Sequence, residues 1–329
     1  MINYNLKKQK NQLLFDYIQK YLSEQGGRSV LSCGWFMEFV STRPDGIPEN
    51  LKRRLIRSYS CKNRFCPLCA WKKAKKDSLI NAVMMQYLYK EHDKEFIFVM
   101  LSVPNVAGDE LRDKISQMNR ALKKMFERKM FKQMNKGYIR KFEVTYNKDR
   151  DDYHPHIHLL IAVNKSYFTS RDYINQTKWL DNWRDVMQDD TIMIVDVRKV
   201  YGDFQKGAME MSKYMAKDAD YLHNEDVFNT FYNALKGLRL TVYDGLFKKA
   251  KALYAQDKLD KYKEQDPNFY ELMEEYIWGR ATTVDQDTGE VIEGTEDEYV
   301  LQELREMSDD ELAKWNGNTV GEMDDFEDD

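Results

Sequence analysis

The sequence has no long hydrophobic run. Its first residues, MINYNLKKQKNQLLFDY, include no apolar stretch of the length that a signal peptide needs. No segment approaches the run of about 20 apolar residues that forms a transmembrane helix. Internal repeats are also absent from the 329 residues. We therefore expect a cytoplasmic protein without a membrane partner, and its 42% hydrophobic residues are enough to form a buried core.

Cysteine is scarce, with four residues in the chain. Because thiols stay reduced in the cytoplasm, we expect the cysteines to bind a metal rather than to form disulfides. Cys66 and Cys69 form a C-x₂-C pair, and Cys61 precedes them. Cys33 can supply a fourth thiolate and so complete a structural zinc site. The alternative for Cys33 is a buried small hydrophobic residue.

Positive and negative charges are unevenly distributed along the chain. Residues 281–329 carry 18 Asp and Glu against two basic residues, a balance of −16. The preceding 280 residues hold 49 Lys and Arg against 37 Asp and Glu, a balance of +12. A basic body with an acidic end is typical of a protein that binds a polyanion. A solvated surface followed by a flexible acidic tail explains the pattern as well, and such a tail can compete with nucleic acid for the basic face.

Several of the basic residues lie in and after the cysteine motif. The run 71-WKKAKK-76 follows Cys69 directly. Such side chains can contact DNA phosphates. Lysines on an exposed helix face are the alternative. The candidate DNA-binding residues are Arg64, Lys72, Lys73, Lys75 and Lys76.

Residues 95–225 alternate between strand-like and helix-like segments. The strand-like segments are 96–103, 138–146, 155–163 and 191–200, and the helix-like segments are 109–133, 171–187 and roughly 204–219. Their order, strand–helix–strand–strand–helix–strand, is the split βαβ pattern of ferredoxin-like folds. Residues 238–243 offer a fifth strand, and 246–278 has a helical pattern.

These segments predict an α+β chain. We expect a central five-stranded antiparallel sheet with flanking helices, in which 138–146 and 155–163 form a hairpin. The predicted parts are an N-terminal zinc-binding, DNA-contacting segment, a sheet domain, a helical extension and an acidic, flexible tail, over residues 1–90, 91–250, 251–280 and 281–329.

Histidine is also rare, yet three of the five histidines occupy the alternate positions 154, 156 and 158. Residues i and i+2 of a strand point to the same face, so His156 and His158 project together. Glu143, on the strand expected to pair with theirs, is the best candidate for a third ligand. Two imidazoles and a carboxylate leave coordination positions for phosphate oxygens, which suits Mg²⁺ or Mn²⁺, with Zn²⁺ as an alternative. Ordinary polar residues at a strand rim are the competing explanation, and His154 fits it.

A tyrosine-containing helix is predicted in 204-FQKGAMEMSKYMAKDADYL-222. At 100° per residue, one side of this helix is a packing face and the opposite side is polar. The packing face contains Ala208, Met211 and Met215, and the polar face contains Glu210, Tyr214, Lys217 and Tyr221.

The polar face combines a nucleophile, a carboxylate and a cation. Tyr214 can attack a phosphodiester if a nearby metal polarises the phosphate, since the pKa of a tyrosine is ordinarily about 10. Lys217 can stabilise the pentavalent phosphate. Glu210 can activate a water molecule for a second, hydrolytic cleavage. An ion pair between Glu210 and Lys213 is an equally good explanation for that carboxylate.

Four segments in this order resemble a known family: 101-LSVPNV-106, 143-EVTYN-147, 154-HPHIHLLIAVNKSYF-168 and 210-EMSKYMAKDADYL-222. They are similar to the rolling-circle replication initiators of small bacterial plasmids. Those proteins belong to the HUH endonuclease superfamily, named for a His-hydrophobic-His motif that is His156-Ile157-His158 here. The similarity covers roughly residues 30–250.

The resemblance implies a ferredoxin/RRM-like HUH endonuclease domain that nicks a plasmid at its double-strand origin. It implies that Tyr214 is the nucleophile and that His156 and His158 are metal ligands. Glu143 fits the place of the third ligand, and Glu210 fits the glutamate that ends the replication round by hydrolysis. The product is a 5′-phosphotyrosyl link with a free 3′-hydroxyl. The acidic tail matches no motif of the family.

The expected partners are origin DNA, single-stranded or in a hairpin, and the host helicase and replication machinery. Two alternatives stay open. The first is a relaxase or transposase of the same superfamily, for which Tyr221 allows a two-tyrosine mechanism. The second is a non-catalytic, zinc-containing DNA-binding regulator. The sequence also leaves open the origin sequence, the physiological metal and the choice between monomer and dimer.

Overall fold

The computed structural model describes residues 3–43, 51–201, 204–212, 216–264, 268, 270–284 and 291–316. The chain divides into two compact units, the first made of Met1–Lys72 and Lys263–Asp329 and the second of Lys73–Tyr262. Each unit contains helices and a sheet, so the predicted α+β class is confirmed. Among the described residues, no helix combines the length and the apolar composition that crossing a membrane requires.

The second unit is built on a five-stranded sheet with the order β6-β3-β5-β4-β7, in which all neighbouring strands are antiparallel. The strands are β3 (Lys94–Ser102), β4 (Gly137–Asn147), β5 (Asp152–Asn164), β6 (Val195–Val200) and β7 (Thr241–Tyr243). The first four follow the split βαβ order that the sequence predicts, and the fifth, β7, lies at the edge beside β4. The central strand β5 is buried over most of its length, which accounts for its unbroken apolar run.

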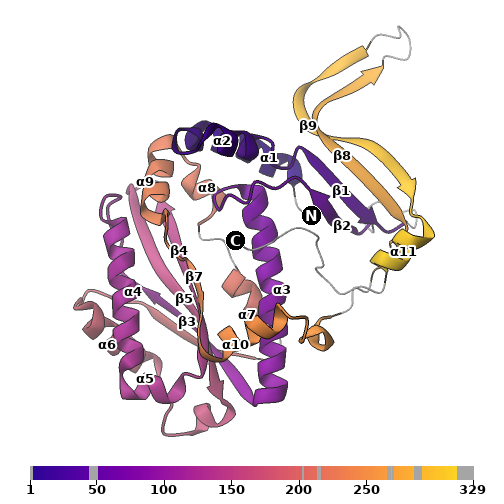
Figure 1. Ribbon diagram of the computed structural model, residues 1–329. Coiled ribbons are helices and arrows are strands. Elements are labelled where there is room, and N and C mark those ends of the chain that lie inside the picture. Colours follow the sequence, from indigo (N-terminus) through magenta and orange to yellow (C-terminus); the bar gives the residue numbers. More distant parts are fainter. Residues whose placement is uncertain are drawn as a thin grey trace. The chain divides into compact units, whose positions relative to one another are not determined.

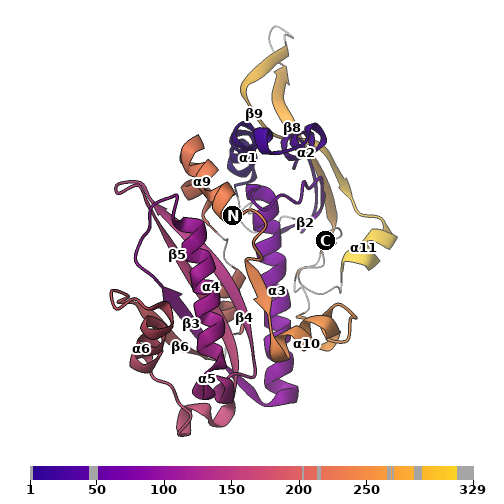
Figure 2. The same cartoon turned by 60° about the vertical axis from the view of Figure 1, so that its left-hand side comes forward.

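Helices cover both faces of this sheet (Figure 1, Figure 2). On one face lie α4 (Leu111–Glu127), α5 (Lys129–Met134), α6 (Gln176–Met187) and α9 (Glu225–Leu235). On the other lie the turns of α3 (Pro67–His92) from Lys73 onward, α7 (Phe204–Ser212) and α10 (Gly245–Tyr254). Short elements complete the unit: η3 (Lys165–Thr169), α8 (Asp218–Tyr221) and η4 (Asp260–Tyr262).

The core on the α3 side of the sheet shows which helix packs on the face that carries the histidines. Leu160 of β5 packs there with Ala208 and Met211 of α7. Because strand residues alternate between faces, His156 and His158 share the face of Leu160. Helix α7 therefore packs against the same sheet face as the two histidines, and the predicted packing role of Ala208 and Met211 is confirmed.

The first unit contains a four-stranded antiparallel sheet with the order β2-β1-β8-β9. Its strands are β1 (Phe36–Ser41), β2 (Arg53–Ser58), β8 (Leu272–Val284) and β9 (Val291–Glu306). Its helices are α1 (Tyr4–Ile18), η1 (Gln19–Tyr21), α2 (Glu24–Leu31) and α11 (Asp309–Trp315). A small core forms where α11 meets the sheet and contains Val40, Ile56, Tyr270, Met273, Met307 and Trp315.

Two predicted segments in the C-terminal part of the chain differ from the structure. The helical extension expected over 251–280 is wrong beyond α10, because residues from 272 onward form β8. Its pairing with β1 and β9 outweighs the local helical pattern. Part of the expected flexible tail is also ordered, as β9 and α11. Residues 317–329 lie outside the described residues.

The predicted helix over 204–222 is interrupted. Helix α7 ends at Ser212, and Lys217 has extended backbone (φ −69°, ψ 141°) before α8 begins. Acidic residues in the first turn of α8 favour a new helix start there. The predicted shared face of Glu210, Lys217 and Tyr221 is therefore wrong, and Tyr221 is instead buried against Phe231. Tyr214 and Met215 lie outside the described residues.

Two other helices are shorter than predicted. The segment 109–133 is divided by the extended residue Arg128 into α4 and α5. The helix expected over 171–187 begins only at Gln176, where the side chain of Asn175 accepts a hydrogen bond from the Lys178 N–H at 2.9 Å. That N-cap satisfies a backbone donor that would otherwise lack a partner.

Candidate functional site

Three predicted metal ligands meet on one face of the β4–β5 hairpin. Glu143 lies directly opposite His156 in the strand register, and His158 follows two residues later on the same face. Oε2 of Glu143 lies 2.9 Å from Nε2 of His158 and 3.6 Å from Nε2 of His156. Both imidazoles are buried. We call Glu143, His156 and His158 the His–Glu cluster, and its assembly follows from strand alternation and antiparallel pairing.

The donor set of the His–Glu cluster fits a divalent cation. Its three ligand atoms lie within 4.8 Å of one another. Ligands at right angles, with bonds of about 2.1 Å, lie about 3 Å apart, which is similar to the observed spacing. Nδ1 of His156 lies 3.2 Å from the carbonyl oxygen of His154. A metal-binding His156 would keep a proton on this Nδ1 and leave its Nε2 lone pair for the ion, and such contacts orient metal-binding histidines.

Charges around the His–Glu cluster keep its carboxylate ionised. Burial opposes ionisation of Glu143, but hydrogen bonds and positive charge from His156 and His158 outweigh it and hold the pKa of Glu143 well below its usual range. Lys141 lies opposite His158 in the register. Burial lowers the pKa of Lys141 to about 8. Lys141 was not among the predicted site residues, although its position two residues before Glu143 places it on the same face.

A buried hydrogen-bond network holds the end of α7. Asn81 Nδ2 of α3 donates to Oγ of Ser212 at 3.2 Å, and the Tyr243 hydroxyl donates to Asn81 Oδ1 at 3.4 Å. Ser212 Oγ donates in turn to the carbonyl oxygen of Ala208 at 2.8 Å. Ser212 is two residues before Tyr214 in the sequence. No sequence signal linked these side chains, because they come from three distant elements.

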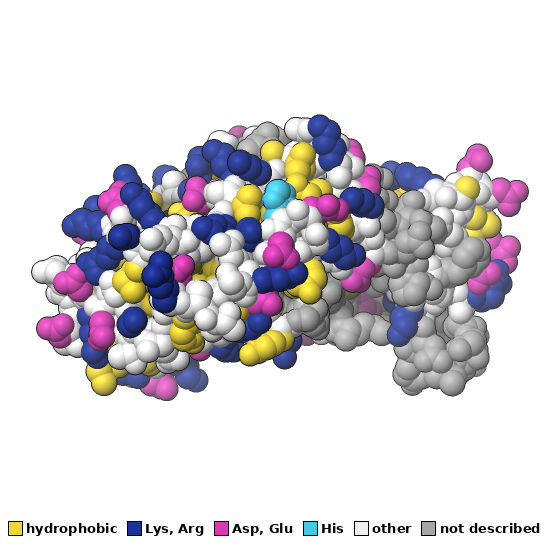
Figure 3. Space-filling view, turned by 90° about the horizontal axis from the view of Figure 1, so that it is seen from below, with side chains coloured by type: hydrophobic (Ala, Val, Ile, Leu, Met, Phe, Trp, Pro, Cys, Tyr) yellow, Lys and Arg dark blue, Asp and Glu magenta, His cyan; other side chains and the backbone are white. Residues whose placement is uncertain are grey.

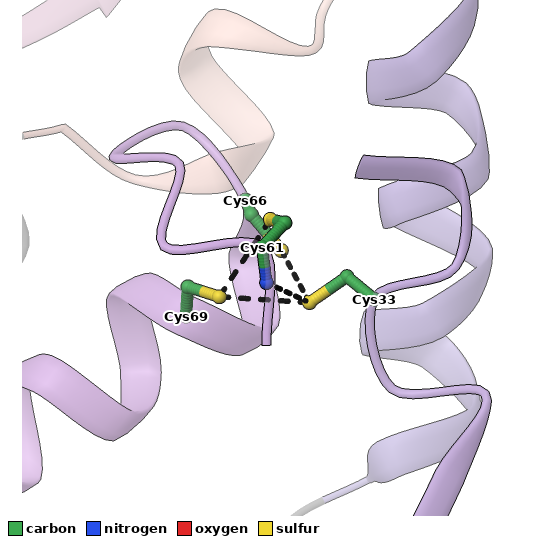
Figure 4. Close-up of side chains that lie close together, drawn as sticks. All are labelled: Cys33, Cys61, Cys66 and Cys69. Atoms are coloured by element: carbon green, nitrogen blue, oxygen red, sulfur yellow. Dashed lines mark hydrogen bonds between the residues drawn. The ribbon is translucent and has the colours of Figure 1, made fainter. Parts of the chain in front are cut away.

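The four cysteines come together in the first unit (Figure 4). Cys33 follows α2, Cys61 and Cys66 lie before and at the start of α3, and Cys69 is in its first turn. The Sγ of Cys33 lies 3.5 Å from the Sγ atoms of Cys66 and Cys69, and those of Cys61 and Cys69 are 3.7 Å apart. All four are free thiols. We call these four residues the cysteine cluster.

The spacing of the sulfurs suits one tetrahedral ion. Four thiolates at about 2.3 Å from a zinc ion lie about 3.8 Å apart, close to the observed separations. Hydrogen bonds from the other three thiols lower the pKa of Cys33 well below its usual value. The hydrogen bond with Cys33 raises the pKa of Cys61, and burial raises that of Cys66. A divalent cation would stabilise the thiolate form of the cysteines that bind it.

Two buried lysines adjoin the cysteine cluster. Lys72 of α3 is 1% exposed, and its Nζ donates to the hydroxyls of Ser58 and Ser60. Lys8 of α1 is 2% exposed, and its Nζ donates to the carbonyl oxygens of Leu31 and Cys33 at 2.7 and 2.8 Å. Burial lowers the pKa of both lysines, and the cysteine charges oppose that shift.

The burial of Lys72 corrects its prediction as a DNA contact. It lies three residues after Cys69, so it points toward the cysteine cluster rather than toward solvent. Arg64, Lys73 and Lys75 are exposed, and Lys76 is half-buried. On the face drawn in Figure 3, Lys and Arg stand among Asp and Glu and do not form one uniformly basic surface.

Comparisons with known proteins find similarity to replication proteins. A family model described as "Replication protein" matches residues 52–284. A protein rep of Staphylococcus aureus is 48% identical over 226 residues, which cover 68% of this chain and 96% of that relative. A protein rep of Bacillus sp is 35% identical over 243 residues, 67% of this chain and 77% of that relative. One from Lactiplantibacillus plantarum is 28% identical over 305 residues, 88% and 85% of the two chains. No solved structure matches the chain.

Proposed function

The chain belongs to the replication protein family whose model matches residues 52–284, and from this premise we propose that it starts plasmid rolling-circle replication. In this proposal the protein is a nicking-joining endonuclease of the HUH superfamily that cuts one strand at the double-strand origin. It acts in the cytoplasm on single-stranded or hairpin DNA, because its nucleophile must reach an exposed phosphodiester. A host helicase and the replication machinery then use the nicked strand.

The chemical step is a transesterification by Tyr214. Its hydroxyl oxygen forms a bond to the scissile phosphorus, the bond from phosphorus to the 3′-oxygen breaks, and that oxygen takes a proton. The product is a 5′-phosphotyrosyl link and a free 3′-hydroxyl. The link conserves the energy of the ester, so a later attack by a hydroxyl can rejoin the strand.

The His–Glu cluster is proposed to hold Mg²⁺ or Mn²⁺ beside the scissile phosphate. When bound, such a cation polarises a phosphoryl oxygen and stabilises the negative charge that develops there. The chain's own contribution is to hold two imidazoles and a carboxylate on one face of a rigid hairpin. Lys141, buried on that face, adds positive charge near the phosphate-binding position.

Two residues near Tyr214 have proposed supporting roles. Glu210, half-buried in α7, activates a water molecule that hydrolyses a second phosphodiester and ends the round without a covalent link. Lys217, exposed three residues after Tyr214, stabilises the phosphate charge from the extended segment before α8. The exposed residues Arg64, Lys73 and Lys75, with Lys76, contact the DNA backbone.

One observation carries the proposal. The His–Glu cluster and α7 share one face of the five-stranded sheet, and α7 leads directly into the segment that contains Tyr214. A DNA-binding regulator would need neither the convergence of two Nε2 atoms on Glu143 nor an anchored helix end at Ser212.

The test is cleavage of single-stranded DNA that bears the plasmid origin, with Mn²⁺ or Mg²⁺. Wild type should form a covalent protein–DNA band on a denaturing gel. Tyr214→Phe should abolish the band, whereas Tyr221→Phe should retain it, because Tyr221 is buried against Phe231. A wild-type protein that binds this DNA but forms no band with either metal contradicts the proposal and favours a non-catalytic regulator.

We also propose that the cysteine cluster binds Zn²⁺ as a structural ion. The four Sγ atoms lie within 4.8 Å of one another and form no disulfide. Closed four-thiolate sites stabilise the fold around them and leave no position for substrate. Zinc here would join the loop after α2 to the start of α3 within the first unit.

A further inference from the structure

Lys8 and Lys72 are the most deeply buried lysines near the cysteine cluster, and no carboxylate accounts for them. Among the ion pairs between described residues, none includes either lysine. Their Nζ atoms instead donate to hydroxyls, to backbone carbonyls and to the side chain of Asn11. Ammonium groups held away from water need an opposite charge nearby, because their desolvation is costly.

The cysteine cluster supplies that charge when it holds a divalent ion. Four thiolates carry −4, and one divalent cation reduces this to −2. Two lysines carry +2, so the buried assembly is neutral. With a monovalent cation the same assembly would carry −1, and with a trivalent cation it would carry +1. The two lysines therefore balance the charge of a tetrathiolate centre that holds one divalent ion.

We propose that Lys8 and Lys72 are the countercharges of a dianionic metal–tetrathiolate centre and so stabilise a divalent ion such as Zn²⁺ in the cysteine cluster. This inference rests on the proposed zinc at the cysteine cluster. The lysines are positioning residues, since their contacts hold the chain around the ligands. Lys72 fixes Ser58 and Ser60 next to Cys61, and Lys8 holds the carbonyl oxygen of Cys33.

The same contacts link the metal to α1. Besides Lys8, Asn11 of α1 donates from Nδ2 to the Sγ of Cys66 at 3.5 Å and to the carbonyl oxygen of Val30 at 3.0 Å. Lys8, Asn11, Leu14 and Ile18 form the buried stripe of this helix. Two of these four residues contact the cysteine cluster or its flanking backbone, so the docking of α1 depends on the charge of the centre.

A charge-compensation experiment on the full chain tests the proposal. Zinc content is first measured by elemental analysis, and zinc release is then followed with a chromophoric chelator. Lys72→Met should accelerate release by about 10- to 100-fold, the range for contacts that support metal ligands. Lys72→Arg should retain most of the wild-type stability of the site. Lys73→Met, an exposed lysine on the same helix, is the matched control and should release zinc at the wild-type rate.

The decisive comparison places Lys72→Met in a Cys61→His background. Cys61 is the half-buried ligand, and histidine in its place leaves the zinc centre with −1 instead of −2. The effect of Lys72→Met on zinc release should then shrink to within about threefold, because less negative charge is left unpaired. The same shrinkage is expected for Lys8→Met.

Each contrary result has a distinct meaning. An equal effect of Lys72→Met in both backgrounds would show that the lysine only fills space, and it would overturn the countercharge proposal. If Cys61→His does not retain zinc, the comparison of Lys72→Arg with Lys72→Met decides, and equal release by both rejects the proposal. A wild-type protein without one equivalent of zinc rejects the zinc site itself.

Discussion

Glu143 is the residue on which the His–Glu cluster depends, because both Nε2 atoms face its Oε2. We predict that Glu143→Ala lowers the nicking rate by about 100-fold or more, since the loss of a charged ligand removes about 3 kcal/mol of transition-state stabilisation. The measurement is the initial rate of single-stranded DNA cleavage over a series of Mn²⁺ concentrations. Glu143→Asp should recover part of the rate at high Mn²⁺.

His154 provides the matched control. It lies on the same strand, its backbone carbonyl oxygen accepts from Nδ1 of His156, and its ring centroid lies 5.4 Å from that of His156, but its side chain faces no atom of Glu143 in the strand register. His154→Gln keeps that carbonyl group, so cleavage should stay within about threefold of wild type, a change of less than 1 kcal/mol. Equal losses in His154→Gln and Glu143→Ala would mean that the strand is sensitive to any substitution.

The His–Glu cluster could be predicted from sequence because it follows from local rules. Alternation places His156 and His158 on one face, and a short connection makes the neighbouring strand an antiparallel partner. The burial of Lys8 and Lys72 could not be predicted. A lysine is usually exposed, and only the docking of α1 and α3 around the cysteine cluster shows that these two are not.

At the level of elements, β4 begins at a position that only glycine fits. Gly137 has φ +149°, and a Cβ there would lie 2.4 Å from the backbone nitrogen of Leu246 and 2.7 Å from the carbonyl oxygen of Asp244. We predict that Gly137→Ala lowers the free energy of unfolding by about 3 kcal/mol, because α10 must move away from the strand. Urea unfolding followed by circular dichroism measures the change.

Gly279 of β8 is the control for that substitution. A Cβ there would meet no heavy atom within 4 Å, and its φ is ordinary. Gly279→Ala should change the free energy of unfolding by no more than about 1 kcal/mol, in the stabilising direction. Similar destabilisation by both substitutions would indicate that the close approach of α10 to Gly137 is unimportant.

Helix α11 is capped by a carboxylate with a perturbed pKa. Glu311 accepts hydrogen bonds from Arg305 and from the Ser308 N–H, and these lower its pKa from 4.5 to about 2. A lowered carboxyl pKa contributes stability that is fully present above about pH 4.5 and is lost as the pH falls toward 2. The difference in unfolding free energy between wild type and Glu311→Gln should therefore be constant from pH 8 to 5 and shrink below pH 4.5.

Ser308 completes the same capping box, and its substitution gives the size of the contribution that the cap makes to stability. Its Oγ accepts from the Glu311 N–H, so Ser308→Ala should cost about 1 kcal/mol of stability at neutral pH. Chemical denaturation at pH 7 checks this value. A difference between wild type and Glu311→Gln that does not change with pH would rule out the paired carboxylate as its source.

Some helices and strands could be predicted from the sequence and others could not. The strands β3, β4, β5 and β6 were predicted because their apolar residues follow a clear local pattern. The break at Lys217, where the backbone is extended, was missed because the helical period of the sequence runs through it without interruption. Strand β8 was missed for a different reason. Its partner β1 lies more than 230 residues earlier, so the decisive hydrogen bonds are not visible in any local window.

At the level of the whole molecule, net charge is the property most open to test. Residues 317–329 contain six Asp and Glu and no basic residue. We predict that truncation after Asn316 tightens DNA binding several-fold at about 50 mM salt, because six negative charges no longer oppose the phosphates. Fluorescence anisotropy with a labelled single-stranded oligonucleotide measures the affinity, and at about 500 mM salt the two proteins should converge.

A full-length variant with these six residues changed to Asn or Gln separates charge from chain length. It should bind DNA as tightly as the truncated protein at low salt. Affinities that stay at the wild-type level would assign any effect of truncation to the loss of the segment and not to its charge. The acidic end was visible from composition alone, but its partial folding into β9 and α11 was not.

The direct pairing of Glu143 with His156 also limits which insertions and deletions the β4–β5 hairpin can accept. A side chain in a strand moves to the opposite face when the register shifts by one residue. One codon inserted between 144 and 147, or between 152 and 155, would turn Glu143 away from both imidazoles while leaving a hydrogen-bonded hairpin. Substitutions in these stretches alter single contacts, whereas insertions and deletions disconnect the ligands from one another. The length of the hairpin between Glu143 and His156 therefore matters to the site as much as the ligands that the hairpin aligns.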